Sequence, residues 1–379
     1  MAENTRESVS TMRKSVYRPA IFVSLLLLPV LSIFLYHLDS FDPADYPDKE
    51  LTRREALFVP HRNAHMLRGS ERLGEGRLLA PEDVAFDPKT GVLYTGCEDG
   101  WVHRVSLNGS VVEKWVNTAG RPLGIVHGLH GEVIVADAVK GLLNISNDGS
   151  IELLTDEAEG QKFKLTDAVD IGRDGTLYFT DASYKYGLHE FIWDILEGRP
   201  YGRFLSYNPS TKETRILVRD LYFANGVAVS SDQSFVIFCE TALRRCQRYY
   251  LEGRRKGSVD MFIDNLPGVP DNIRYDGEGL YWIALSTGIS YPVDLLQRYP
   301  FIRKVLAIME RYIGRPKMEK NGGVIAVDLD GKPTALYQDR DISSMSSAIK
   351  IGDHLYCGSV SSPYILRLNV DRYPAMPRV

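Results

Sequence analysis

The sequence predicts an all-β fold, a six-bladed β-propeller with helical insertions, preceded by one N-terminal transmembrane helix. Three observations predict this: an apolar run near the N-terminus, a strand-turn-strand pattern that recurs from residue 80 onward, and a spacing of that pattern close to the length of a propeller blade. The 379 residues, 44% apolar and 25% charged, have the composition of a globular protein. The net charge of −4, with no basic cluster among aromatic residues, argues against a nucleic-acid partner.

Residues 21–38 form an apolar run long enough for one membrane span. Four basic residues precede it and four aspartates follow it: Arg6, Arg13, Lys14 and Arg18, then Asp39, Asp42, Asp45 and Asp48. This asymmetry predicts a signal anchor, with residues 1–20 as a cytosolic tail and the rest of the chain in a lumen or outside the cell. We therefore expect a single-pass type II protein of the endomembrane system, in the endoplasmic reticulum, the vacuole or at the cell surface. A cleaved signal peptide and a buried core helix are the alternatives.

After a Pro- and Asp-rich stalk at residues 39–67, the propeller is expected at residues 68–372, before a short tail at residues 373–379. Six copies of the turn-plus-strand unit start at residues 87, 130, 173, 231, 276 and 352. Three of the five spacings are near the blade period, and two are longer. A strand within residues 71–79 should complete the last blade.

The two longer spacings carry insertions, near residues 184–201 and 288–320. Within them, residues 188–199 and 292–313 have apolar residues three and four positions apart, which is typical of helices. Such helices could simply cover a blade face, form a lid over the central channel, or make a second contact with a membrane.

Two features fit a lumenal or extracellular propeller. Asn108 and Asn144 begin glycosylation sequons. Cys239 and Cys246 flank a predicted hairpin turn, so they could face each other and form a disulfide, although buried free thiols are the alternative.

The starts of the innermost strands should face a common point at the mouth of the channel. The polar residues at these starts are Glu82, Thr166, Asp167, Asn225, Asp271, Asn272 and Ser346. Carboxylate, amide and hydroxyl oxygens are the ligands of a hard cation, and we expect Ca²⁺. Taken alone, each of these residues is better explained as a residue that favours a turn. The prediction of a cation site therefore depends on their standing at the same position in different blades.

The segments PEDVAFD, RPLGI, LTDAVDI, DGTLYFTDAS, FANGVAVS and PDNIR resemble the strictosidine synthase-like family of plants over about residues 70–370. That family is similar to the animal adipocyte plasma membrane-associated proteins and to the paraoxonases, which are calcium-dependent six-bladed propellers. The resemblance implies a catalytic calcium with four ligands of matching type: Glu82, Asn225, Asp271 and Asn272. A fifth ligand is an asparagine in the paraoxonases, and Thr166 stands at that position here. It also implies a structural calcium at Asp83, Asp167 and the carbonyl of Ile125.

Two departures limit what the resemblance implies. Leu123 occupies the position of the paraoxonase histidine that is proposed as a base, and His127 and His130 are expected at a blade surface or turn. Ser346 replaces the glutamate on which strictosidine synthase depends, so true strictosidine synthase activity is not expected.

The first hypothesis is therefore a calcium-dependent hydrolase of small esters or lactones. Glu82 and Asn225 would fix the ion, and Asp271 would bind it and also activate water or attack the carbonyl. The second is an amine-aldehyde condensing enzyme that uses a carboxylate from an insertion: Glu190, Asp194 or Asp294. The third is a propeller without enzymatic activity that binds a ligand or partner.

Overall fold

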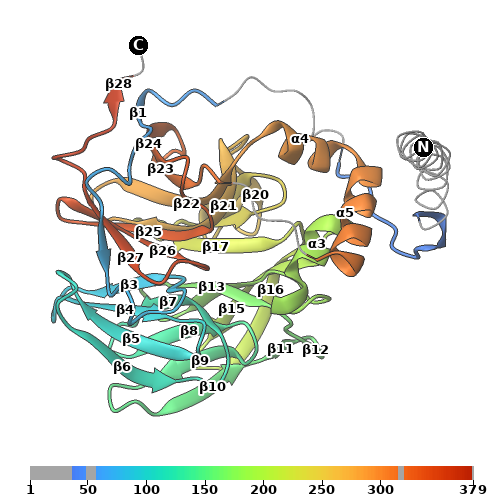
Figure 1. Cartoon of the computed structure of the whole chain (residues 1–379). Coiled ribbons are helices and arrows are strands. Elements are labelled where there is room, and N and C mark those ends of the chain that lie inside the picture. Colours follow the sequence, from blue (N-terminus) through green and yellow to red (C-terminus); the bar gives the residue numbers. More distant parts are fainter. Residues whose placement is uncertain (1–35, 48–56, 315–319, 378–379) are drawn as a thin grey trace, which may run out of the picture.

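The computed structural model describes residues 36–47, 57–314 and 320–377, and within them the chain forms a ring of six blades (Figure 1). Each blade has four strands that pair antiparallel, and the first of them lies next to the channel. From the channel outward, the blades are β3 (Val84–Asp87), β4 (Val92–Gly96), β5 (Trp101–Ser106) and β6 (Val112–Asn117); β7 (Pro122–His127), β8 (Val133–Asp137), β9 (Gly141–Ile145) and β10 (Ile151–Thr155); β13 (Thr166–Ile171), β14 (Leu177–Asp181), β15 (Gly202–Asn208) and β16 (Glu213–Leu221); β17 (Ala224–Val229), β18 (Phe235–Glu240), β19 (Arg245–Tyr250) and β20 (Val259–Ile263); β21 (Gly268–Tyr275), β22 (Leu280–Gly288), β23 (Gly323–Asp328) and β24 (Pro333–Gln338); and β25 (Met345–Ile351), β26 (His354–Ser359), β27 (Ile365–Asn369) and β2 (Glu71–Leu73).

The hydrophobic core is divided among the interfaces between blades. Every adjacent pair of described blades shares a cluster of buried apolar side chains, including the pair that closes the ring, where Leu73 and Ile365 pack near Val84 and Leu93. Both faces of most strands are therefore buried. This explains why the inner strands are rich in Val, Ile, Ala and Phe rather than strictly alternating.

The ring is closed by β2, which pairs with β27 as the fourth strand of the last blade. The predicted closing strand is thus present, but it ends at Leu73.

The domain boundaries predicted at residues 68 and 372 are wrong, because flanking residues are part of the folded body. β1 (His61–Asn63) pairs with β24, and β28 (Met376–Pro377) pairs with β1, so the fifth blade has six strands. Val59 and Met66 are buried in the clusters on either side of this blade. Apolar side chains within the predicted stalk therefore contribute to the core.

Both insertions are helical, as predicted. The first contains the 3-10 helix η1 (Leu188–Glu190) and α3 (Phe191–Glu197); the second contains α4 (Tyr291–Arg298) and α5 (Pro300–Tyr312). The first insertion follows β14 and the second follows β22, and the ends of these strands pair with the starts of the inner strands β13 and β21. Both insertions therefore leave the ring at the end where the predicted site residues lie. α3 and α5 contact each other there.

Two smaller elements complete the fold: the hairpin of β11 (Glu157–Ala158) and β12 (Gln161–Lys162), and the 3-10 helix η2 (Gly253–Arg255). No helix in residues 36–47, 57–314 or 320–377 is both long and apolar enough to cross a membrane. The anchor predicted at residues 21–38 lies almost entirely outside the described residues.

Candidate metal centre

The candidate site forms where the inner strands begin. In five of the six described blades, the register between the innermost strand and its neighbour shifts within the first residues. Such irregularities break the alternation of faces and re-aim side chains. Two consecutive residues, Asp271 and Asn272, can therefore both contribute to the same cluster.

Two motif glycines allow these irregular strand starts to pack closely. A Cβ atom on Gly226 would lie 2.5 Å from the carbonyl oxygen of Asp271, and one on Gly124 would lie 2.6 Å from that of Asp167. Neither separation is possible for a real side chain, so the glycines of the FANG and PLG segments are required by the approach of the next blade.

Three carboxylates converge at this point. Oxygen atoms of Glu82, Asp167 and Asp271 all lie within 4.8 Å of one another. Asn272 Nδ2 donates a hydrogen bond of 2.8 Å to Glu82 Oε1, which orients that carboxylate. Glu82 and Asp167 are buried, whereas Asp271 is half-buried, so Asp271 is the most exposed carboxylate of the cluster.

At or next to the starts of three inner strands, buried oxygen atoms lack partners within the described part of the chain: Glu82 Oε2, Thr166 Oγ1 and Asn225 Oδ1. A buried acceptor without a partner costs about 1–3 kcal/mol. Carboxylate, amide and hydroxyl oxygens are the donor set of a hard cation. The residues present therefore fit calcium.

Electrostatics favour a cation at the same place. Burial raises the pKa of Glu82 well above its usual range, and the neighbouring carboxylates of Asp83 and Asp271 raise it further. Burial and the charge of Asp167 likewise raise the pKa of Asp271. For Asp167, burial and the charge of Asp83 raise the pKa to about 8. Without a positive charge, these carboxylates hold protons to a higher pH than usual.

The structural calcium implied by the resemblance is not supported, because a side chain fills its position. The guanidinium of Arg274 pairs with Asp83 and donates a hydrogen bond of 2.6 Å to the carbonyl oxygen of Ile125. A second donation, of 3.0 Å, reaches the carbonyl of Val169. Arg274 thus supplies the positive charge at two of the three predicted ligands, and Asp167 belongs to the upper cluster. Sequence reasoning missed Arg274, although it stands two residues after Asn272 in the same strand.

The two departures from the resemblance have structural roles. The hydroxyl of Ser346 donates a hydrogen bond of 2.6 Å to the carbonyl oxygen of Glu82, and Ser347 donates another of 2.8 Å. Both serines therefore hold the Glu82 backbone in place. Leu123 is buried in an apolar cluster at the mouth of the channel.

That apolar cluster forms a roof over the mouth. Leu123, Leu165 and Phe223 come from the blades, and Phe191 and Ile195 of α3 pack against them. Tyr46 is buried in the same cluster, and its hydroxyl donates a hydrogen bond of 2.9 Å to the Ile195 carbonyl. The first insertion is therefore a lid, which resolves one of the alternatives left open by the sequence.

Asp194 is one of two carboxylates that α3 buries, and Glu197, the other, is paired with Lys185. The Oδ2 of Asp194 lacks a partner within the described residues, and burial raises its pKa to about 7. Glu190 is exposed, and Asp294 pairs with Arg298 at 2.8 Å. Of the three insertion carboxylates considered, Asp194 alone is enclosed near the channel.

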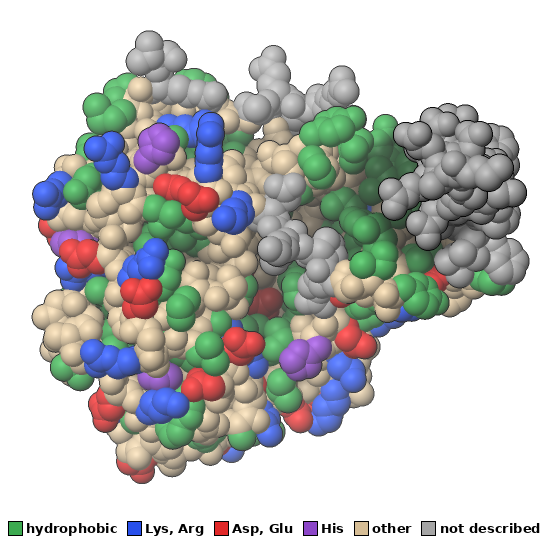
Figure 2. Space-filling model, in the orientation of Figure 1, with side chains coloured by type: hydrophobic (Ala, Val, Ile, Leu, Met, Phe, Trp, Pro, Cys, Tyr) green, Lys and Arg blue, Asp and Glu red, His purple; other side chains and the backbone are tan. Residues whose placement is uncertain are grey.

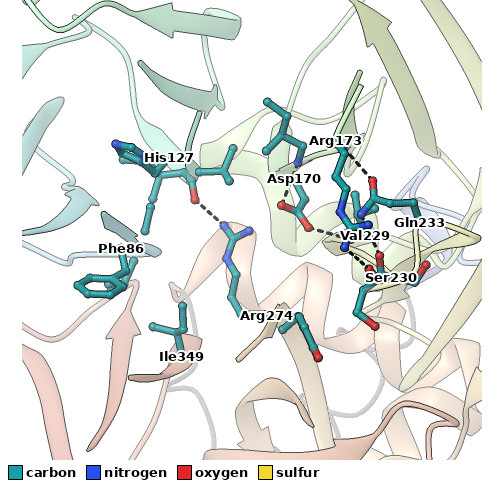
Figure 3. A pocket seen from close by; sticks show the side chains of 16 residues that line it. Phe86, His127, Asp170, Arg173, Val229, Ser230, Gln233, Arg274 and Ile349 are labelled. Atoms are coloured by element: carbon teal, nitrogen blue, oxygen red, sulfur yellow. Dashed lines mark hydrogen bonds between the residues drawn. The ribbon is translucent and has the colours of Figure 1, made fainter. Parts of the chain in front are cut away.

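A cavity of about 330 Å³ lies at the opposite end of the channel (Figure 3). It is lined by the far ends of the inner strands, and Arg274 lies between it and the Glu82 cluster. Asp170 accepts hydrogen bonds from the Ile171 and Val229 amides. His127, expected at a blade surface or turn, lines this cavity instead.

The remaining predicted sites lie away from the channel. Cys239 and Cys246 are directly paired across β18 and β19 and form a disulfide. Asn108 is exposed in the turn between β5 and β6. Asn144 is a poor glycan acceptor, because it lies half-buried in β9 between two neighbouring strands and its Oδ1 is buried.

Two family models match the chain. The strictosidine synthase model matches residues 167–254, and the strictosidine synthase-like N-terminal model matches residues 60–105. Protein strictosidine synthase-like 6 of Arabidopsis thaliana is 53% identical over 360 residues, which cover 94% of this chain and 96% of that protein. The chain belongs to the strictosidine synthase-like family. The adipocyte plasma membrane-associated protein of Rattus norvegicus is 33% identical, with 91% of this chain and 97% of that protein covered.

Solved structures share the propeller fold of this strictosidine synthase-like chain. A gluconolactonase from Xanthomonas campestris matches with a TM-score of 0.58 at 16% identity, covering 84% of this chain and 99% of that one. Regucalcin from Agrobacterium tumefaciens, a calcium-binding protein, matches with a TM-score of 0.57 at 17% identity, covering 82% and 95%. At this identity the likeness shows the fold alone.

Proposed function

We propose that this strictosidine synthase-like protein is a calcium-dependent hydrolase of small esters or lactones. The observation that carries the proposal is the cluster of Glu82, Asp167 and Asp271, whose oxygens lie within 4.8 Å of one another beside orphaned acceptors. The gluconolactonase and regucalcin among the structures of the same fold support this choice of reaction and ion.

The roles follow from the positions of the residues. Glu82 and Asn225 would hold the ion with their unpartnered oxygens, and Asn272 keeps Glu82 in orientation. When bound, calcium supplies a Lewis acid for the substrate carbonyl and for the negative charge that develops on it. Asp271, the half-buried carboxylate, would take a proton from the attacking water or attack the carbonyl itself. The lid would exclude bulk water.

Hydrolysis of phenyl acetate and of a simple lactone by the full-length protein tests this proposal. Chelation should abolish turnover, and readdition of calcium should restore it. Glu82→Gln should lose activity, whereas Glu213→Gln, at an exposed pair with Arg215, should keep it. Unchanged esterase activity in Glu82→Gln would contradict the proposal.

Asp194 favours amine-aldehyde condensation as a second candidate. A buried carboxyl with a pKa of about 7 and a free oxygen is suited to move protons near neutral pH. Condensation that survives chelation but is lost in Asp194→Asn would favour this reaction over hydrolysis. Calcium binding without either turnover would favour a ligand-binding propeller.

We also propose that residues 21–38 anchor the protein as a single-pass type II membrane protein, with the propeller on the lumenal or extracellular side. The flanking charges support this orientation. The disulfide Cys239–Cys246 also supports it, because such bonds persist in oxidising compartments.

A further inference from the structure

We propose that the outer face of α4 and α5 lies on the surface of the lipid bilayer, beside the anchor. We call this surface the bilayer face. It consists of Tyr291, Tyr299, Phe301, Val305, Met309, Tyr312 and Ile313. The inference rests on the proposed anchor, and it adds a second membrane contact that holds the propeller in one orientation.

The helix α5 presents an apolar stripe to the outside. Phe301, Val305 and Met309 are spaced four residues apart, and their exposed fractions are 56%, 42% and 40%. On the other side of the same helix, Arg303 and Ala307 are buried against the lid. The helix therefore buries a charged residue and exposes large apolar ones, which is the reverse of an ordinary surface helix.

The apolar exposure is concentrated at these helices. Seven of the twenty large apolar side chains exposed in the described part of the chain fall within residues 291–313. Figure 2 shows hydrophobic side chains gathered over the region of α4 and α5, whereas charged side chains are interspersed over much of the rest of that view. A contiguous exposed apolar surface marks an interaction site.

The position of the anchor identifies a bilayer as the occupant. The apolar run of the sequence ends at Leu38. Next to it, the ring of Tyr36 lies 4.6 Å from Lys304 Nζ, and Asp39 pairs with Arg311 at 2.5 Å. Both contacts are made to α5. The chain thus leaves its proposed membrane span directly beside the bilayer face.

The residue types also suit a membrane boundary. Three of the seven members are tyrosines, which prefer the level of the lipid headgroups. Two of the nearby basic residues are paired with acidic ones, Arg311 with Asp39 and Arg298 with Asp294. Attachment should therefore depend on apolar insertion rather than on anionic lipid, and it should resist salt.

This contact would turn the candidate metal centre toward the membrane. α5 packs on α3, and α3 covers the mouth of the channel. Esters dissolved in the bilayer would then reach the mouth over a shorter path than esters in bulk water.

Site-directed nitroxide labelling of the full-length protein in phosphatidylcholine vesicles tests the inference. The label is attached to Val305→Cys, and in a matched control to Leu153→Cys, which is exposed on β10 at the rim of another blade (Figure 1). The native cysteines do not compete, because Cys97 and Cys357 are buried and the other two are bonded. Collisions are measured with oxygen, which enters lipid, and with a water-soluble nickel chelate.

We expect the label at Val305 to be reached by oxygen and to lose its collisions with the chelate, at low and high salt alike. The Leu153 label should remain open to the chelate. If the chelate reaches Val305 as readily as Leu153, the inference is overturned. If the label at Val305 is shielded from both reagents even when the protein is in detergent, a second copy of the chain covers the bilayer face. That result would also overturn the inference. Retention on vesicles after alkaline washing is scored separately, so failure of the anchor is distinguished from failure of the bilayer face alone.

Discussion

Arg274 shows how one side chain can replace an ion. It holds Asp83 and the carbonyls of Ile125 and Val169 together at the centre of the ring. An arginine remains charged at all physiological pH values, so this link between blades does not depend on free calcium.

We therefore predict one calcium ion per chain. In the upper channel, Glu82, Asp83, Asp167 and Asp271 face the two guanidiniums of Arg121 and Arg274. Because Arg274 pairs with Asp83, the carboxylates of Glu82, Asp167 and Asp271 remain as a single cluster, which can hold one calcium ion. Isothermal titration calorimetry of chelator-treated protein should give a stoichiometry of one. A stoichiometry of two would show that a second site exists despite Arg274.

A double-mutant cycle should measure the pairing of Arg274 with Asp83. Arg274→Met leaves a buried carboxylate without its partner, which should cost about 3–5 kcal/mol of unfolding free energy. Adding Asp83→Asn should recover much of that loss, because no uncompensated charge then remains. Urea unfolding with excess chelator supplies the measurement. Additive losses in the double variant would contradict the pairing.

The helical lid, formed by α3 with α5 packed on it, is held to the propeller differently from the way the blades are held to one another. It is fastened by residues 39–47, where Ala44 accepts a hydrogen bond from Arg303 and Tyr46 bonds to Ile195. The Arg303 guanidinium lies over the Tyr46 ring at 4.5 Å. These contacts come from side chains and a short irregular segment, whereas each blade is held by strand pairing on one axis and by packing on the other.

Tyr46→Ala should therefore loosen the lid without unfolding the propeller. We expect faster hydrogen exchange in α3 and α5, and unchanged exchange in an inner strand such as β17. Tyr46→Phe removes only the hydrogen bond to Ile195 and should have a smaller effect, about 1 kcal/mol. Equal acceleration in lid and blades would show that the lid does not open independently.

At the scale of the whole molecule, the sequence was sufficient for the ring and for much of the centre. The blade count, the helical insertions and the strand that closes the ring were predictable, because each leaves a period or a turn signal in the chain. Arg274 was not predictable, and Asp194 could not be distinguished from Glu190 and Asp294, since the pattern shows a residue on a strand or helix but not which groups surround it when buried. Residues 57–67 were misassigned to a stalk for a related reason. Their short strand has no alternating pattern, and only its pairing with β24 reveals it.

The buried carboxylates should also give the whole protein an unusual dependence on pH. Burial raises the pKa values of Glu82 and Asp271, and those of Asp167 and Asp194 to about 8 and about 7. Between the ordinary aspartate pKa near 4 and these raised values, the folded state binds more protons than the unfolded state. The chelated protein should thus lose stability as pH rises from about 5 to about 8.

Calcium should reverse that loss, because it supplies at high pH the charge that protons supply at low pH. We expect the increase in melting temperature caused by saturating calcium to be larger at pH 8 than at pH 5. Exposed carboxylates with lowered pKa values, such as Asp148, titrate below this window and should not contribute. Thermal unfolding with chelator and with calcium at both pH values measures the difference. If the increase is the same at pH 5 and pH 8, protons and calcium do not compete for these carboxylates, and the ion must bind elsewhere.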